Sequence, residues 1–203
     1  MTVLGMLRHA ETSWSATRRI QGRFDVPLSN TGRQWLRDRR VPQEWCNLRV
    51  VSSPLVRCVQ TAHCLALEPF DLEPRIVEMS WGAWEGQTLG ALRARFGPVM
   101  LDNEARGMDF QPTDGESPRQ VWDRIRPWLA EIAAAKQPTL AVAHRGVMRV
   151  IFAKAINWDL CGRPPAKLDW NCMQLFYLQS DGHPEVLRLN HPLEAVESAA
   201  GKP

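Results

Sequence analysis

Histidine and arginine stand together where short apolar runs of the chain end. Arg8 and His9 follow the first apolar run, His144 follows a later one, and Arg57 comes shortly after a third. An imidazole can attack phosphorus and hold a phosphoryl group, while guanidiniums neutralise the oxygens of a transferring phosphate. A single histidine at a strand end is more often structural than nucleophilic, but two that each adjoin arginine favour chemistry on a phosphate ester.

The elements that must position these residues alternate between apolar runs and amphipathic segments. This alternation predicts a three-layer α/β/α fold with a mostly parallel sheet, in which ligands bind beyond the carboxyl ends of the strands. Buried strands are expected at Val3–Leu7, Leu48–Ser52 and Thr139–Ala143, and a hairpin at Met173–Leu178 and Glu185–Leu189. Helices are expected from Ser29 to about Arg40, from Ser53 as N-cap to about Leu67, at Leu89–Phe96, from Ser117 to about Ala135, and at Val147–Ile156.

The domain organisation expected from length is a single domain over residues 1–190. Residues 85–116 carry glycine, proline and aspartate, and we expect them to form a helical insertion that caps the site. Residues 191–203 are expected to be a frayed tail.

The charge of the chain is biased towards arginine at its start. Of 25 basic residues, 21 are arginine, and the first 40 residues hold eight arginines against three acidic residues, although the total is only +3. Arginine matches phosphate oxygens bidentately, so an anionic small molecule is a natural ligand, whereas the acidic remainder argues against nucleic acid. Five scattered cysteines, no signal peptide and no membrane-length apolar run favour a cytoplasmic protein without membrane association.

Several blocks of the sequence resemble the signatures of the histidine phosphatase superfamily, the group that includes cofactor-dependent phosphoglycerate mutases. The blocks occur in the family's order and span roughly residues 3–150. They are Leu7-Arg-His-Ala-Glu-Thr12, Arg19-Ile-Gln-Gly-Arg-Phe-Asp-Val-Pro-Leu-Ser29, Ser52-Ser-Pro-Leu-Val-Arg-Cys-Val-Gln-Thr-Ala62, Glu78-Met-Ser-Trp-Gly-Ala-Trp-Glu-Gly86, Gly115-Glu-Ser117 and Ala143-His-Arg-Gly-Val147. The resemblance implies a phosphoglycerate mutase-like fold.

The resemblance also implies a role for each matching residue. His9 would be the nucleophile that becomes phosphohistidine, and Glu78 would be the general acid and then the base. Glu85 is the competing carboxylate. The phosphate pocket would be completed by Arg8, Arg57 and His144, with Gln21 and Gly22 over the substrate and the backbone of Gly146 facing the phosphate.

Three positions depart from the family pattern. Ala10 replaces the glycine after the nucleophile, which forbids easy positive φ. Ser15 stands where asparagine is common; its hydroxyl can still donate to a phosphate oxygen, but from a shorter side chain. Arg145 adds a cation that faces either the pocket or solvent.

The function expected is metal-independent, cofactor-independent hydrolysis of a small phosphorylated metabolite. Phosphoglycerate mutase activity is one alternative, because both reactions share a phosphohistidine. A catalytically weak phosphate-binding or interaction protein is another, because of Ala10 and Ser15. A metal hydrolase is a weaker alternative, since no metal-binding motif is present. The family often forms dimers, so a homodimer is a further expectation.

Overall fold

The centre of the computed structural model, which describes residues 1–196, is a six-stranded sheet of order β4-β3-β5-β1-β6-β7. β4, β3, β5 and β1 are parallel to one another, whereas β6 and β7 form an antiparallel hairpin at one edge. The prediction of a mostly parallel sheet is therefore confirmed. Its strands are β1 (Thr2–Arg8), β3 (Arg49–Ser52), β4 (Asp71–Leu72), β5 (Thr139–Ala143), β6 (Cys172–Leu178) and β7 (Pro184–Pro192).

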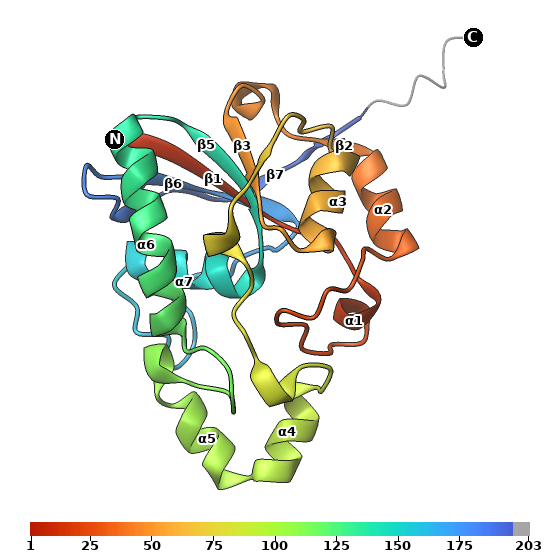
Figure 1. Ribbon diagram of the computed structural model, residues 1–203, viewed down its shortest axis with the longest axis vertical. Coiled ribbons are helices and arrows are strands. Elements are labelled where there is room, and N and C mark those ends of the chain that lie inside the picture. The colour runs from red at the N-terminus through yellow and green to blue at the C-terminus, as the bar shows by residue number, and fades with distance from the viewer. Residues whose placement is uncertain (197–203) are drawn as a thin grey trace.

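Helices cover both faces of this sheet, with α2 and α3 on one face and α6 and α7 on the other (Figure 1). The layers follow from the two-residue alternation of strand side chains. Leu4 and Met6 of β1 pack in the core beneath α6 and α7, whereas Leu7 packs in the core beneath α2 and α3. The predicted three-layer arrangement is confirmed, and its helices are α2 (Asn30–Arg37), α3 (Val56–Cys64), α6 (Pro118–Ala135) and α7 (Arg145–Ala155).

The carboxyl ends of β1, β3 and β5 meet at one edge of the sheet. Arg8 pairs with Ala143, and Ser52 pairs with Val142. The backbone N–H of His9 continues this pairing by donating to the carbonyl of Ala143 over 3.1 Å. The register of the parallel strands thus delivers the predicted histidines and arginines to the same place.

A small helical cap lies beyond this end of the sheet (Figure 1). It contains α4 (Leu89–Phe96), which the sequence predicts, and α5 (Pro98–Glu104), which it does not. Gly97 ends α4 with a positive φ of 52° and Pro98 opens α5, so the break between them is a feature of local residue type. The cap has its own small core of Ile20, Trp84, Leu92 and Met100.

Short elements complete the described chain. One small helix, α1 (Ser13–Ala16), follows β1, and the pair of β2 (Arg39–Arg40) and β8 (Glu194–Ala195) is antiparallel. The remaining turns of 3₁₀ helix are η1 (Gln43–Trp45), η2 (Pro74–Ile76), η3 (Gly82–Trp84) and η4 (Gly107–Asp109). No helix among the described residues is both long and apolar enough to span a membrane.

Three expectations about element boundaries are wrong. The helix expected to reach about Arg40 ends at Arg37, because Arg39 and Arg40 form β2. α3 begins at Val56 rather than directly after Ser53, and no side chain caps it. The hydroxyl of Ser53 lies 2.7 Å from Nε2 of His144 and accepts from the N–H of Leu55 in the loop before α3. The frayed tail expected over residues 191–203 is wrong for its first part, since β7 and β8 extend to residue 195; residues 197–203 lie outside the described residues.

Stability depends on α6, whose apolar face fills one layer of the core. Ile125 is fully buried there, whereas its neighbour Arg126 is exposed. We expect Ile125→Ala to lower the free energy of unfolding by about 2–5 kcal/mol through lost burial and a cavity. Arg126→Ala is the matched control and should change it by no more than about 0.5 kcal/mol. Urea denaturation measures both, and equal effects would contradict this packing.

Candidate active site

His9 lies directly after β1 and is almost fully buried, with 3% of its surface exposed. Its Nδ1 is 2.8 Å from the carbonyl oxygen of Ala10. Because a carbonyl can only accept, Nδ1 carries the proton of the neutral ring and Nε2 keeps its lone pair. Burial, followed by the neighbouring cations of Arg8 and Arg57, holds the pKa of His9 well below the usual imidazole value. The ring is therefore held as a neutral base with Nε2 as its available atom.

His144 occupies the N-cap position of α7 directly after β5, makes no capping hydrogen bond with its side chain, and is fully buried. Its ring centroid lies 5.3 Å from that of His9, with the two planes tilted by 58°. Nε2 of His144 is 2.7 Å from the hydroxyl of Ser53 and 3.4 Å from the thiol of Cys58. Burial, followed by the positive charge of Arg57, lowers the pKa of His144 well below its usual range. The two imidazoles are thus adjacent, neutral and fixed in orientation.

Arg57 is the largest fully buried side chain of the described residues, with none of its surface exposed. It donates to the carbonyl of Gly22 over 2.7 Å and to that of Phe24 over 2.8 Å. Burial is the main cause that lowers the pKa of this guanidinium, against the negative charges of Glu78 and Asp25, which raise it. The loop around Gly22 is therefore attached to the site through Arg57.

Unused donors are concentrated on the two predicted arginines. Within residues 1–196, three buried side-chain nitrogen or oxygen atoms lack a hydrogen-bond partner: Nε of Arg8, Nε of Arg57 and Nδ1 of His191. Buried donors are nearly always paired, so an unpaired one needs an explanation. An oxyanion bound beside His9 would supply acceptors for a guanidinium donor of both arginines.

Glu78 borders the same site with only 9% of its surface exposed. One carboxylate oxygen accepts from the backbone N–H of Met79 over 2.8 Å, and the other accepts from that of Gly146 over 3.1 Å. A Cβ on Gly146 would lie 2.3 Å from this carboxylate, so only glycine allows the approach. The backbone of Gly146 therefore contacts the carboxylate, rather than standing free to face a phosphate as the resemblance implies.

Glu85, the competing carboxylate, is occupied by the backbone. It accepts from the N–H groups of Arg23, Phe24 and Trp81 over 2.9–3.1 Å. A Cβ on Gly22 would collide with it at 1.9 Å, which explains the glycine at that position. Glu85 thus ties the loop of residues 22–24 to the segment that follows Glu78.

Three other residues predicted to bind substrate, Ser15, Gln21 and Arg145, make contacts outside the cluster of His9, Arg57 and His144. The hydroxyl of Ser15 accepts from the N–H of Thr12 and donates to its carbonyl, which completes the capping box of α1 with Thr12 as N-cap. Gln21 accepts from the hydroxyl of Thr12 over 2.8 Å, which orders the loop beside the site. Arg145 is exposed, with its guanidinium carbon 5.2 Å from the ring centroid of Trp170. Burial is the main cause that lowers the pKa of Arg8, and the positive charge of Arg145 is the second cause.

The replacement of glycine by Ala10 causes no backbone strain. Ala10 is not among the described non-glycine residues with a positive φ. Its N–H donates to the hydroxyl of Thr61 over 3.1 Å, and that hydroxyl donates to the carbonyl of Arg57. α3 therefore fixes the backbone next to His9 as well as supplying the buried cation.

An ion cluster behind Glu78 was not predicted. The guanidinium of Arg124 donates to the carbonyls of Arg75 and Val77 and to the carboxylate of Glu116. Glu116 also accepts from the N–H of Ser80 over 3.0 Å and from Arg23 over 2.8 Å. Glu116 lies in a quoted sequence block, but nothing in the sequence near Arg124 indicates that it reaches this segment. The cluster holds the backbone on both sides of Glu78.

The site as a whole combines a neutral imidazole with a free Nε2, two arginines with unused buried donors, a second imidazole and one partly buried carboxylate. It can receive a tetrahedral oxyanion, and it offers both a nucleophile and a proton donor or acceptor. No group of three or more histidine, cysteine or acidic side chains in residues 1–196 is arranged to hold a metal ion.

Comparison with known proteins gives consistent results. Residues 4–192 match the model of the histidine phosphatase superfamily (branch 1). The chain is 31% identical over 179 residues to a glucosyl-3-phosphoglycerate phosphatase of Mycolicibacterium vanbaalenii, with 78% of each chain covered. It is 31% identical over 161 residues to phosphoglycerate mutase-like protein 4 of Arabidopsis thaliana, covering 74% of this chain and 69% of that one.

Among solved structures, a phosphoserine phosphatase of Entamoeba histolytica in complex with 3-phosphoglyceric acid superposes with a TM-score of 0.77. It is 25% identical and covers 94% of this chain and 97% of its own. The family match spans nearly all of the described chain and agrees with the sheet order and with the residues gathered at its edge. The chain therefore belongs to branch 1 of the histidine phosphatase superfamily and is a phosphomonoesterase of that family.

Proposed function

We propose that the enzyme hydrolyses phosphomonoesters of small metabolites without a metal, through a phosphohistidine formed on His9. The observation that carries the proposal is the pair of unpartnered guanidinium donors on Arg8 and Arg57 beside a neutral imidazole whose Nε2 is free. Fixed cations of this kind stabilise the charge on transferring phosphoryl oxygens, the work that a metal does elsewhere.

The first chemical step joins Nε2 of His9 to phosphorus while the ester P–O bond breaks. Glu78 gives its proton to the leaving oxygen, so the alcohol departs neutral. In the second step Glu78 takes a proton from water, the water oxygen bonds to phosphorus, and the N–P bond breaks to release inorganic phosphate. Arg8, Arg57 and His144 contact the phosphoryl oxygens throughout both steps.

The assignment of Glu78 as the proton donor rests on its contacts. Its two backbone hydrogen bonds come from Met79 and Gly146, which leave room on each oxygen for a further partner. Glu85 already accepts three backbone hydrogen bonds and joins two loops. Glu78 is therefore the carboxylate with capacity for a substrate oxygen.

A direct assay tests the reaction. Purified enzyme incubated with a panel of phosphorylated metabolites should release inorganic phosphate, and His9→Ala should lower the rate by about a thousandfold or more, because the nucleophile is gone. Added EDTA should leave the rate unchanged. Rates no better than those of His9→Ala would instead indicate a phosphate-binding protein, and conversion of 3-phosphoglycerate to 2-phosphoglycerate without free phosphate would indicate a mutase.

The leaving group reveals which carboxylate is the acid. Glu78→Gln should slow cleavage of an alkyl phosphate by about 10²–10⁴-fold, the usual contribution of a general acid. It should slow p-nitrophenyl phosphate far less, because nitrophenolate departs without a proton. Glu85→Gln is the matched control and should affect both substrates by a similar factor. The reverse pattern would assign the acid to Glu85.

The lowered pKa values of the two histidines predict how they titrate. In phosphate-free enzyme at pH 6, the ring ¹⁵N shifts of His9 and His144 should be those of neutral imidazole, with His9→Gln and His144→Gln used for assignment. Because the folded state holds fewer protons than the unfolded chain, the free energy of unfolding should fall as pH drops below about 6.5. An imidazolium spectrum at pH 6 for either ring would contradict the neutral resting state.

A further inference from the structure

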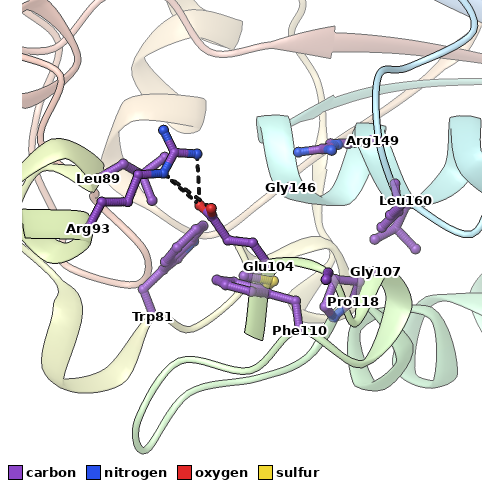
Figure 2. A pocket seen from close by; sticks show the side chains of 14 residues that line it. Trp81, Leu89, Arg93, Glu104, Gly107, Phe110, Pro118, Gly146, Arg149 and Leu160 are labelled. Atoms are coloured by element: carbon purple, nitrogen blue, oxygen red, sulfur yellow. Dashed lines mark hydrogen bonds and ion pairs between the residues drawn. The ribbon is translucent and has the colours of Figure 1, made fainter. Parts of the chain in front are cut away.

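A cavity of about 450 Å³ lies between the cap and α7 (Figure 2). Its walls combine apolar side chains of Trp81, Phe110 and Leu160 with three charged ones, Arg93, Glu104 and Arg149. This volume is typical of a pocket that encloses a small metabolite.

The cavity adjoins the residues that bind the carboxylate of the proposed proton donor, Glu78. Met79 and Gly146 line it, and the backbone N–H groups of these same two residues hold the carboxylate of Glu78. If Glu78 protonates the leaving oxygen, as the proposed function requires, the phosphorus side of that oxygen faces His9. The carbon skeleton of the alcohol then extends past Gly146 into this cavity.

The charges of the cavity are not balanced. The guanidinium of Arg93 on α4 donates to the carboxylate of Glu104 on α5 at 2.8–3.2 Å, so these two charges compensate each other (Figure 2). Arg149 stands on the α7 side of the cavity, away from this pair (Figure 2). Its guanidinium makes no hydrogen bond or ion pair to any of residues 1–196, and it is half-buried. One uncompensated cation therefore faces the space that the alcohol would occupy.

Arg149 is held in orientation without using its donors. Its guanidinium carbon lies 5.1 Å from the ring centroid of Trp158, and the indole N–H of Trp158 donates to the carbonyl of Cys161 over 2.8 Å. Burial, followed by the positive charge of Arg145, lowers the pKa of Arg149. A half-buried cation beside another cation is stabilised by a bound anion, and a guanidinium fork matches the two oxygens of a carboxylate.

We propose that the preferred substrates are phosphomonoesters whose alcohol carries a second acidic group, a carboxylate in the simplest case, and that Arg149 binds this group in the cavity. The apolar walls of Trp81, Phe110 and Leu160 enclose the carbon skeleton between the two anionic ends. The phosphate site thus supplies the chemistry, and Arg149 supplies selectivity for the alcohol.

The test uses ω-carboxyalkyl phosphates of increasing chain length, each beside its uncharged primary amide of the same size. Phosphate release gives kcat/KM for every compound. At the best chain length, the wild-type enzyme should prefer the acid over the amide by about tenfold or more, as a charge-assisted hydrogen bond provides. Arg149→Met should bring this ratio close to one, and Arg149→Lys should keep part of it.

The ratio of acid to amide is measured on one protein preparation, so partial misfolding of a variant cancels. Arg37→Met, which removes an exposed arginine from α2 on the opposite face of the sheet, is the matched control and should keep the wild-type ratio. No preference at any chain length, or an equal loss on acid and amide in Arg149→Met, would overturn the assignment. Failure of the proposed function looks different, because the wild type would then cleave neither series faster than His9→Ala.

Discussion

The burial of one positive charge is the constraint on which the site depends. Arg57 has no exposed surface, and its guanidinium donates to the carbonyls of Gly22 and Phe24 rather than to a carboxylate. An ionised group in such a position costs free energy unless its donors are satisfied. If the loop at residues 22–24 left the site, the buried guanidinium of Arg57 would lose both of its hydrogen bonds. A bound oxyanion would supply an acceptor for the remaining donor, Nε. Arg57 therefore gives the candidate site a positive charge and also holds the loop at residues 22–24 in place.

Two carboxylates on the other side of that loop complete the arrangement. Glu85 binds backbone N–H groups of the loop and of Trp81, while Glu116 binds the side chain of Arg23 and the N–H of Ser80. The loop and the segment that carries Glu78 are thereby joined to each other as well as to α3. Glu78 and Arg57 keep a fixed separation because the intervening backbone is bonded at several points rather than at one.

Sequence patterns predicted the frame of this site well, for a physical reason. Apolar runs identify buried parallel strands, and the carboxyl ends of neighbouring strands must meet, so the sequence predicts the shared location of Arg8, His9 and His144. Predictions for serine hydroxyls were less successful, because several hydrogen-bond partners compete for each hydroxyl. The sequence predicts that the hydroxyl of Ser53 caps a helix, but α3 has no side-chain cap and this hydroxyl contacts His144. The hydroxyl of Ser15 bonds to Thr12 in the capping box of α1, a contact not predicted from the sequence. A hydroxyl near several possible partners is assigned only by three-dimensional packing.

The cap was the least predictable part, since its second helix and the cavity beside Arg149 depend on contacts between distant segments. Its core of Ile20, Trp84, Leu92 and Met100 is distinct from the two cores that support the sheet, and Trp81 and Phe110 pack against both this core and the one beneath α6 and α7. Substitutions inside the cap can therefore reshape the cavity without disturbing the strands that carry the histidines. Under the proposed function, the cap walls of the cavity can change while α7 and the strands stay in place, so a gene duplicate of this enzyme could acquire a new substrate in evolution while keeping its phosphoryl-transfer residues intact.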